Sequence, residues 1–255
     1  ETAAIHALAT SLTDMRERLA RAVIGYTYDR KPVTCEDLKV AGVMTVLLRD
    51  ALKPNLVQST EGHPMIGHGF PFANVAHGNS SVLADLVALK LADYVVTESG
   101  FGAENGFQKL VEMKCRQSGL KVDAAVVVAS IRALKQHGGA FVLRPGRPYS
   151  SVKEAAETKN IEAVEAGCAN LARNIEIVRT FGVPAVVVVN RFTSDTDEEI
   201  EIARTKALEA GAVGFAVSEG WAKGGEGALD LADQVLKAAE ASSATKYLYP
   251  EDISI

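Results

Sequence analysis

The 255-residue sequence has few cysteines, no long apolar run and no excess of positive charge. Its three cysteines, Cys35, Cys115 and Cys168, are odd in number and widely spaced, so they form neither a CxxC motif nor a disulfide framework. This pattern fits a reducing, cytoplasmic setting. No apolar stretch reaches the roughly 18 residues that a bilayer crossing needs, and no charged segment followed by an apolar one opens the chain. With a net charge of −5, we expect neither a nucleic acid nor a membrane as partner.

What the sequence does contain is an alternation of short apolar stretches and segments with helical spacing, which is typical of β-α units on a parallel sheet. The stretches that predict strands are 56–59, 94–97, 124–129, 185–189 and 213–217. Helices are predicted over 36–52, 160–181 and 195–210, and a last one carries Ala228, Leu231, Val235 and Ala238. Residues 5–22 keep the spacing of one helix, although Ser11 can also begin a new helix as its N-cap.

We therefore predict an α/β fold with a mostly parallel sheet flanked by helices. The whole chain, 1–255, reads as one α/β unit, with a helical lead-in over 1–53, β-α repeats over 54–241 and an irregular tail over 242–255. Glu1 is not a methionine and the opening already reads as helix interior, so we expect the chain to be the central part of something longer.

Ligands of parallel sheets bind beyond the carboxyl ends of the strands, so the strand exits are the candidate sites. The exit after 56–59 is rich in glycine and holds His63, His68 and His77. It either presents backbone N–H groups to an anion or forms a turn in which Asn79 or Ser80 caps the next helix. The spacing of the three histidines matches no metal motif, so no metal site is predicted and hydrogen-bonding roles are favoured.

The later exits carry charge and aromatic rings. Arg132 and Lys135 lie three residues apart after 124–129, where they either contact an acidic ligand or are solvated surface charges. Phe192 follows the next strand, and Trp221, the only tryptophan, follows the last one in a glycine-rich loop. Such rings suit stacking on a flat heterocycle, although plain packing is nearly as good an interpretation.

Two nucleotide-binding motifs are missing or imperfect. Residues 98–106 approach the dinucleotide fingerprint, but the third glycine comes one residue late and no ribose-binding acid follows at the right distance. This disfavours the alternative of an NAD-dependent oxidoreductase. The pattern G-x-x-x-x-G-K-[ST] is absent, so the chain has no recognisable cradle for nucleotide phosphates.

Read together, the exits resemble the formate–tetrahydrofolate ligase family over nearly the whole chain. The stretches that carry the resemblance include KPVTCEDLKVAGVMTVLLRDALKPNLVQS at 31–59, PFANVAHGNSS at 71–81, LKLADYVVTESGFGAENGFQKLVEMKCRQSGL at 89–120, VASIRALKQHGG at 128–139, FGVPAVVVVNRF at 181–192 and SEGWAKGGEGALDLA at 218–232. The stretch VASIRALKQHGG is like a pattern used to identify the family. Phe70 departs from it, because the family usually has glycine before PFAN, and Gly220 takes a position often filled by a larger residue.

The resemblance implies an ATP-dependent ligase of one-carbon metabolism with a P-loop-NTPase-like fold. Members activate formate with ATP to formyl phosphate, which the N10 amine of tetrahydrofolate attacks to give 10-formyltetrahydrofolate. Mg²⁺ and a monovalent cation accompany the ATP, and the assembly is a homo-oligomer, commonly a homotetramer.

The resemblance also assigns candidate site residues. Phe192 and Trp221 match the aromatic pair that sandwiches the pterin of the folate. The nucleotide side is matched by Asn74, His77, Gly78, Asn79, Phe101 and Gly102. Further candidate contacts to anions or other ligand groups are Arg132, Lys135, Glu219 and Lys223.

The matched region is the middle of a longer family protein, in which a Walker-type lysine loop precedes the point matching Glu1 and a further domain follows Ile255. Phosphoryl transfer needs fixed positive charge and backbone donors at the γ-phosphate, and we expect catalytic residues of that kind in the preceding segment. The 255 residues alone are then expected to be no competent ligase. The alternative is a non-catalytic folate- or nucleotide-binding fragment or a degenerate paralogue.

Overall fold

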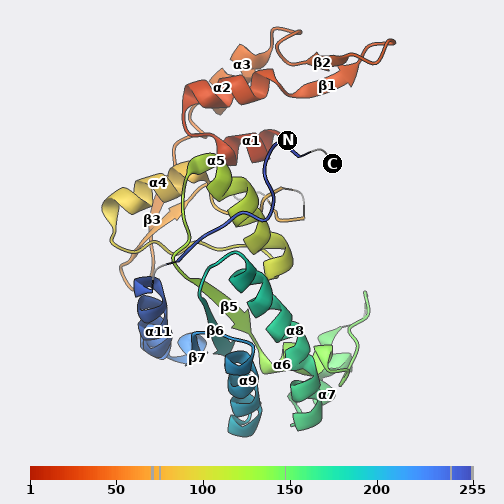
Figure 1. Ribbon diagram of the computed structural model, residues 1–255, viewed down its shortest axis with the longest axis vertical. Helices are drawn as coiled ribbons and strands as arrows, with labels where there is room; N and C mark the ends of the chain where they lie inside the picture. The colour runs from red at the N-terminus through yellow and green to blue at the C-terminus, as the bar shows by residue number, and fades with distance from the viewer. Residues whose placement is uncertain (70–71, 75, 147, 242, 254–255) are drawn as a thin grey trace. The chain divides into compact units, whose positions relative to one another are not determined.

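The computed structural model describes residues 1–69, 72–74, 76–146, 148–241 and 243–253 (Figure 1). Phe70, where the sequence departs from the family pattern, lies outside the described residues. The chain forms two compact units, Glu1–Leu120 (unit 1) and Lys121–Ile255 (unit 2). Among the described residues, no helix has both the length and the apolar character that a bilayer crossing requires.

Unit 1 consists of short helices and two hairpins. Its elements are α1 (Thr2–Leu8), α2 (Leu12–Ala20), β1 (Val23–Tyr26), β2 (Pro32–Thr34), α3 (Ala41–Leu48), β3 (Asn55–Gln58), β4 (Pro64–Gly67), α4 (Val82–Leu91), the π-helical segments η1 (Ala103–Phe107) and η2 (Leu110–Cys115), and α5 (Arg116–Ser118).

The sequence allowed either one helix over residues 5–22 or a new helix that begins at Ser11. The structure has the new helix. The Ser11 hydroxyl accepts a hydrogen bond from the Asp14 N–H at 3.1 Å and caps α2. Met15 and Leu19 on α2 are fully buried and pack with Leu52 into the core of unit 1.

Two hairpins of unit 1 differ from the sequence predictions. β1 and β2 pair antiparallel in the segment predicted as a helical lead-in, and α3 is shorter than the predicted helix over 36–52. β3 confirms a strand near 56–59, but it pairs antiparallel with β4 rather than belonging to a parallel sheet. The reason is the short connection: the Ser59 N–H donates to the His63 carbonyl at 2.8 Å, whereas parallel neighbours need a crossover of a dozen or more residues.

The strand predicted over 94–97 does not form. Tyr94 is 60% exposed and Val96 is 92% exposed, and nothing in the described part of the chain pairs with this stretch as a ladder. An apolar stretch reads as a strand in sequence, but it becomes one only where a neighbouring strand supplies hydrogen-bond partners.

Unit 2 is the α/β part of the chain. Its elements are β5 (Ala125–Ala129), α6 (Ile131–His137), the 3₁₀ turn η3 (Tyr149–Ser151), α7 (Lys153–Glu157), α8 (Ile161–Thr180), β6 (Ala185–Asn190), α9 (Asp197–Glu209), β7 (Gly214–Ser218), α10 (Gly220–Lys223), the 3₁₀ segment η4 (Gly224–Ala228) and α11 (Leu229–Glu240).

The sheet of unit 2 is parallel, with the order β5-β6-β7, and confirms the last three predicted strands and the α/β fold class. The five apolar residues of β6 are buried, as a central parallel strand requires. Figure 1 shows α11 at one side of the strands and α8 at the other, and both contact β6. The predicted helices over 160–181 and 195–210 are confirmed as α8 and α9.

Helices α6 and α8 approach closely because Gly138, the C-cap of α6, and Gly167, in α8, each face the backbone of the other helix. A Cβ on Gly138 would lie 1.8 Å from the Ala163 carbonyl oxygen, and one on Gly167 would lie 1.9 Å from that of Leu134. Any side chain at these two positions would force the helices apart. This contact fixes α6, which carries two of the candidate ligand contacts.

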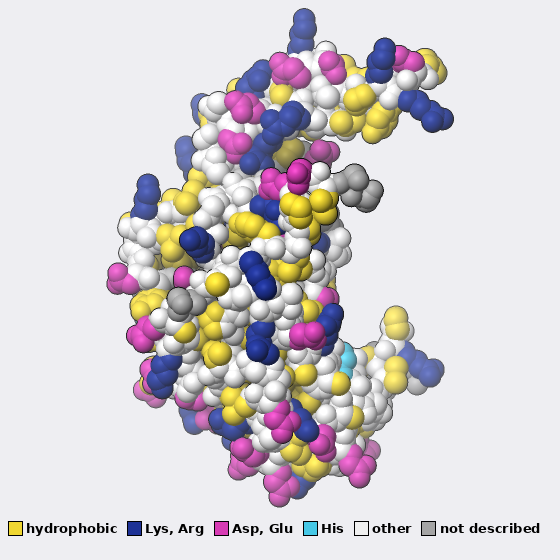
Figure 2. All heavy atoms as spheres, in the orientation of Figure 1, with side chains coloured by type: hydrophobic (Ala, Val, Ile, Leu, Met, Phe, Trp, Pro, Cys, Tyr) yellow, Lys and Arg dark blue, Asp and Glu magenta, His cyan; other side chains and the backbone are white. Residues whose placement is uncertain are grey.

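Over the face shown in Figure 2, lysine and arginine side chains are interspersed with aspartate and glutamate and do not gather into one basic patch.

Candidate functional site

The carboxyl ends of β6 and β7 lie side by side in unit 2. Asn190 at the end of β6 is paired in register with Ser218 at the end of β7, and the Arg191 N–H donates to the Ser218 carbonyl at 3.0 Å. Phe192 and Trp221 therefore leave the sheet from adjacent strands. Phe192 is 42% exposed and Trp221 is 96% exposed, so neither ring is sealed in a packed interior.

Arg132 lies on one face of the Phe192 ring. Its guanidinium carbon is 4.2 Å from the ring centroid of Phe192 and 5.7 Å from that of Tyr149. A terminal nitrogen also lies 3.6 Å from a Glu157 carboxylate oxygen, and the Arg132 side chain is 26% exposed. The Ser130 hydroxyl begins α6 by accepting a hydrogen bond from the Ala133 N–H at 3.3 Å. The chain leaving β5 is thereby turned so that Arg132 reaches the exit of β6.

The backbone of Phe192 is held by Asp195. The Asp195 carboxylate accepts a hydrogen bond from the Phe192 N–H at 2.8 Å, and the Asp195 N–H donates to the Phe192 carbonyl at 3.0 Å. Asp195 is 5% exposed, and its other carboxylate oxygen has no hydrogen-bond partner among the described residues. Burial raises the pKa of the Asp195 carboxyl, against the opposing effects of the Phe192 N–H, Lys135 and Arg132.

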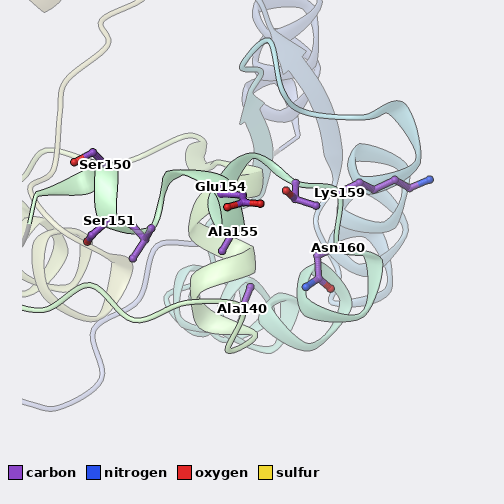
Figure 3. Close-up of a pocket in the computed structure, with 9 residues that line it drawn as sticks. Ala140, Ser150, Ser151, Glu154, Ala155, Lys159 and Asn160 are labelled. Atoms are coloured by element: carbon purple, nitrogen blue, oxygen red, sulfur yellow. The ribbon is translucent and has the colours of Figure 1, made fainter.

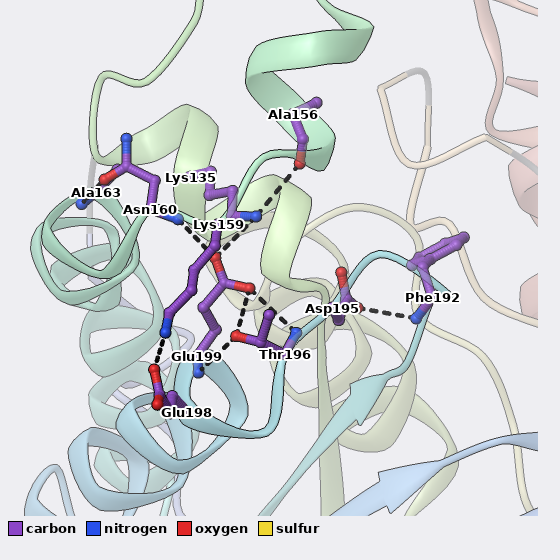
Figure 4. A network of polar contacts seen from close by, with 10 residues as sticks. All are labelled: Lys135, Ala156, Lys159, Asn160, Ala163, Phe192, Asp195, Thr196, Glu198 and Glu199. Carbon is purple, nitrogen blue, oxygen red and sulfur yellow. Dashed lines mark hydrogen bonds and ion pairs between the residues drawn. The ribbon is translucent and has the colours of Figure 1, made fainter.

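Beneath this turn, Lys135 and Glu199 form an ion pair at 2.8 Å in which both side chains are 0% exposed (Figure 4). Glu199 also accepts hydrogen bonds from the Asn160 N–H at 2.9 Å and from the N–H and hydroxyl of Thr196 at 3.1 and 2.9 Å. Thr196 in turn caps α9. Burial alone would raise the pKa of Glu199, but Lys135 and these donors lower it.

Lys135 is therefore not the solvated surface charge that was one interpretation of the sequence. Its ammonium group is paired with Glu199 and also donates to the Ala156 carbonyl at 3.4 Å. The pair joins the end of α6 to the first turns of α8 and α9, and so it supports the loop that carries Phe192.

Trp221 lies in α10, a single helical turn in the predicted glycine-rich segment. Glu219 and Lys223 on either side of it form an ion pair with each other, and this lysine lowers the pKa of Glu219. The Glu219 N–H donates to the Gly227 carbonyl at 3.0 Å, which closes the loop around Trp221. Both charged side chains remain accessible, with exposures of 39% for Glu219 and 57% for Lys223.

In unit 1, the structure brings the candidate nucleotide residues of two loops together. The Asn79 amide donates to the Ser99 hydroxyl at 2.8 Å, and the Gly100 N–H donates to the Gly78 carbonyl at 3.0 Å. Gly78 has a φ of 70°, and a Cβ there would lie 2.2 Å from the Ala73 Cβ. Only glycine meets both conditions.

Phe101 is held in a conformation that non-glycine residues rarely adopt. Its φ is 65° and its side chain is 69% exposed, with Gly102 next to it as the N-cap of η1. Left-handed backbone at a bulky residue costs of the order of 1–3 kcal/mol and is concentrated at functional sites. The π-helical turns that follow in η1 and η2 are likewise frequent at such sites.

His77 is completely buried, and neither ring nitrogen has a hydrogen-bond partner among the described residues. Burial, followed by the charges of Lys114 and Lys109, lowers the pKa of His77 to about 4, so the ring is neutral at pH 7. Lys109 donates to the carbonyls of Ala73 and Ala76, which anchors the loop before His77. Asn74 in the same loop is exposed.

His68 has a structural environment, whereas His63 is exposed. His68 contacts the Ser81 hydroxyl at 2.6 Å and the Ala51 carbonyl at 2.8 Å, and Ser81, rather than Asn79 or Ser80, caps α4. In the part of the chain that the structure describes, no group of three or more metal-ligating side chains is close enough to hold an ion.

A shallow hollow of about 450 Å³ lies between η3, α7 and the start of α8 (Figure 3). Two of its polar residues are already engaged: the Asn160 side chain accepts from the Ala163 N–H at 3.0 Å, and Lys159 pairs with Glu198. In Figure 3 the Lys159 side chain points away from the hollow. No candidate residue from the sequence lines it.

Sequence reasoning missed Asp195, Tyr149 and Lys109, which hold the candidate residues in place. Asp195 has the only detectable pattern: it lies five residues after the end of β6 and accepts from the N–H three residues before it, a local contact that Asp side chains commonly make. Nothing in the spacing of Tyr149 or Lys109 indicates their contacts.

The chain matches the family model described as formate–tetrahydrofolate ligase over residues 1–255. A formate–tetrahydrofolate ligase from Desulforamulus reducens is 54% identical over 255 residues, which cover 100% of this chain and 44% of the relative. Ligases of the same name from Roseiflexus castenholzii and Desulforapulum autotrophicum are each 52% identical over the whole of this chain, covering 45% and 42% of their own length. The chain thus spans less than half of each of these relatives.

Proposed function

Because this chain belongs to the formate–tetrahydrofolate ligase family, we propose that it supplies the folate-stacking wall and part of the nucleotide wall of an ATP-dependent ligase. The reaction joins formate to tetrahydrofolate and gives 10-formyltetrahydrofolate, ADP and phosphate. The observation that carries the proposal is the exposure of Phe192 and Trp221 at the adjacent exits of β6 and β7.

In the proposed reaction, a formate oxygen attacks the γ-phosphorus of ATP, the bond to the β-γ bridging oxygen breaks, and formyl phosphate and ADP result. The N10 amine of tetrahydrofolate then attacks the formyl carbon, phosphate leaves, and the amine loses its proton. A flat pterin between two rings is fixed in its plane, which holds N10 at one position. Such positioning avoids the loss of translational and rotational entropy that a bimolecular attack in solution would involve.

We assign the nucleotide wall to unit 1. Phe101 offers an exposed ring on a backbone held in the left-handed region, and the Asn79–Ser99 and Gly78–Gly100 hydrogen bonds fix the loops beside it. Neutral His77 brings no positive charge of its own to this wall. Glu219 and Lys223 stay proposed as accessible polar contacts beside Trp221.

Among the described residues, no group of three or more His, Cys, Asp or Glu side chains could hold a metal ion, and Mg²⁺ and a monovalent cation stay part of the proposal for the whole protein. Mg²⁺ in phosphate-transferring enzymes is bound largely by substrate phosphates and water. No step above is assigned to an ion. A cytoplasmic homotetramer stays part of the proposal for the whole protein, and sedimentation of that protein tests its oligomeric state.

Binding of tetrahydrofolate to the 255-residue chain tests the folate wall. Because Trp221 is the only tryptophan, its intrinsic fluorescence should be quenched by tetrahydrofolate as a stacked ring covers it. Stacking on an aromatic side chain contributes about 1–3 kcal/mol, so Phe192→Ala should weaken binding about 5- to 150-fold. Calorimetric titration of Trp221→Ala should give a loss of similar size.

Tyr247→Ala is the matched control. Tyr247 is 43% exposed. Its neighbour Lys246 donates its N–H to the Phe181 carbonyl at 3.0 Å, which places this part of the chain near the start of β6 and not at the strand exits. Tetrahydrofolate affinity should not change in this variant. Binding by Phe192→Ala that equals that of the unaltered chain would reject the folate wall.

A further inference from the structure

We propose that Arg132 is a positioning residue for Phe192: its guanidinium group covers one face of the ring, so that only the other face is left for the flat heterocycle. This inference rests on the proposed function, since it needs Phe192 to stack on the folate. Sequence reasoning treats Arg132 as a candidate contact to an anionic ligand, and the structure supports a different role.

The geometry of the Arg132 side chain carries the argument. A cation within about 6 Å of an aromatic centroid is attracted to the face of the ring, and the Arg132 guanidinium carbon is 4.2 Å from the centroid of Phe192. The second aromatic neighbour, Tyr149, lies 5.7 Å away, and Glu157 lies 3.6 Å from a terminal nitrogen. Two rings and one carboxylate of its own unit thus surround the guanidinium group, whose buried Nε has no hydrogen-bond partner among the described residues.

Phe192 is consequently held at two points. Asp195 fixes its N–H, and Arg132 covers one face of its ring. An aromatic ring held in one orientation loses less rotamer freedom on binding than a free one, and this pre-organisation favours the bound state.

The charges that face Arg132 also fit this role. Asp195 and Glu157 are its acidic neighbours, and the ammonium group of Lys135 is neutralised by Glu199. A carboxylate or phosphate that approached the terminal nitrogen beside Glu157 would have to compete with that carboxylate. Arg132 is therefore better suited to holding Phe192 than to binding an anion.

The test is a double-mutant cycle on tetrahydrofolate binding, followed by the fluorescence of Trp221 in the 255-residue chain. Arg132→Met keeps the length of the side chain and removes the planar cation, so affinity should fall about three- to tenfold. Arg132→Lys retains the charge without the planar group and should lie between Arg132→Met and the unaltered chain. In the Phe192→Ala background, Arg132→Met should change affinity by less than about twofold, because Arg132 acts through that ring.

The chain offers a matched control in Arg204, whose guanidinium carbon lies 4.6 Å from the ring centroid of Phe215, a buried residue of β7. Arg204→Met removes an equivalent contact away from the strand exits and should leave affinity unchanged. Circular dichroism checks the fold of every variant, and Arg132→Lys replaces Arg132→Met in the cycle if the latter does not fold.

The outcomes separate the two proposals. If Phe192→Ala weakens binding and Arg132→Met does not, the positioning role is wrong and the folate wall stands. If the effects of Arg132→Met and Phe192→Ala are additive, Arg132 contacts the ligand itself and the positioning role is again wrong. If Phe192→Ala binds as the unaltered chain does, the folate wall fails and the inference fails with it.

Discussion

Replacing Lys135 by methionine should destabilise unit 2 by about 3–5 kcal/mol, the range found when one member of a buried ion pair is removed. The pair is 2.8 Å long and both side chains are 0% exposed. At an effective dielectric constant of about 20, two unit charges at that distance attract by about 6 kcal/mol. Desolvation of the two ions offsets much of this attraction, but in Lys135→Met the buried Glu199 carboxylate keeps its desolvation cost without its cation.

Hydrogen exchange of peptides from β6 is the measurement, because β6 is buried in unit 2 and its protection reports the opening of that unit independently of unit 1. The experiment is done at pH 7. The pKa of Glu199 is lower in the folded chain than its ordinary value of 4.5. The ionised carboxylate therefore contributes its full stabilisation of the fold above pH 4.5, and this stabilisation is lost only as the pH falls through the pKa of the folded state. Lys135→Met should speed β6 exchange by roughly two to four orders of magnitude.

The double variant Lys135→Met/Glu199→Gln provides the control, since it removes both charges and keeps an oxygen for the Thr196 N–H. The double variant should lose less free energy of unfolding than the two single variants lose in sum, by about 2 kcal/mol or more. Additive costs, or a cost of less than about 1 kcal/mol for Lys135→Met, would refute the view that a buried charge is left unpaired.

Two further predictions concern histidine titration and helix packing. His77 has a folded pKa of about 4 against an ordinary value of 6.5, so unit 1 should lose up to about 3 kcal/mol as the pH falls from 6.5 to 4, because the unfolded ring takes up a proton that the folded one refuses. Hydrogen exchange of peptides from η2 should show this loss, and His77→Gln should remove it; an unchanged pH dependence would contradict the assignment. Gly167→Ala should destabilise unit 2 by about 1–3 kcal/mol, since its methyl group would meet the Leu134 carbonyl oxygen at 1.9 Å. Gly42→Ala in α3, where a Cβ meets nothing within 4 Å, should instead stabilise unit 1 by up to about 1 kcal/mol. Hydrogen exchange measures the change in stability of each variant, and changes of the same sign in both would contradict the packing argument.

The α/β part of the fold was predictable because its sequence features agree with its packing. The uninterrupted run of valines in β6 needs burial on both faces, and α9 begins at a capping residue, Thr196, followed by three acidic residues. The hairpins of unit 1 were not predictable in this way. All four residues of β3 are exposed, so no burial pattern shows its direction, and its partner is decided by a tight turn.

The candidate site was predictable only to the level of which residues leave the sheet. The order of the strands along the chain indicated that Phe192 and Trp221 come from neighbouring exits. The position of Arg132 over Phe192 was not predictable, because it depends on the close contact of α6 with α8 at Gly138 and Gly167. The burial of Lys135 has the same origin, since its partner Glu199 lies on a helix far along the chain.

The parallel sheet of unit 2 also has a consequence for how the chain acquires its structure. β5 pairs with β6 only after α6, α7 and α8 have been made, and β6 then pairs with β7 across α9. Contacts between residues so distant in sequence slow folding, because the intervening chain must be ordered before the contact forms. During synthesis the apolar β6 strand emerges before β7 and α11, which contact it in the finished unit. Until they arrive, the apolar residues of β6 lack these neighbours, and transiently exposed apolar strands of this kind are prone to aggregate.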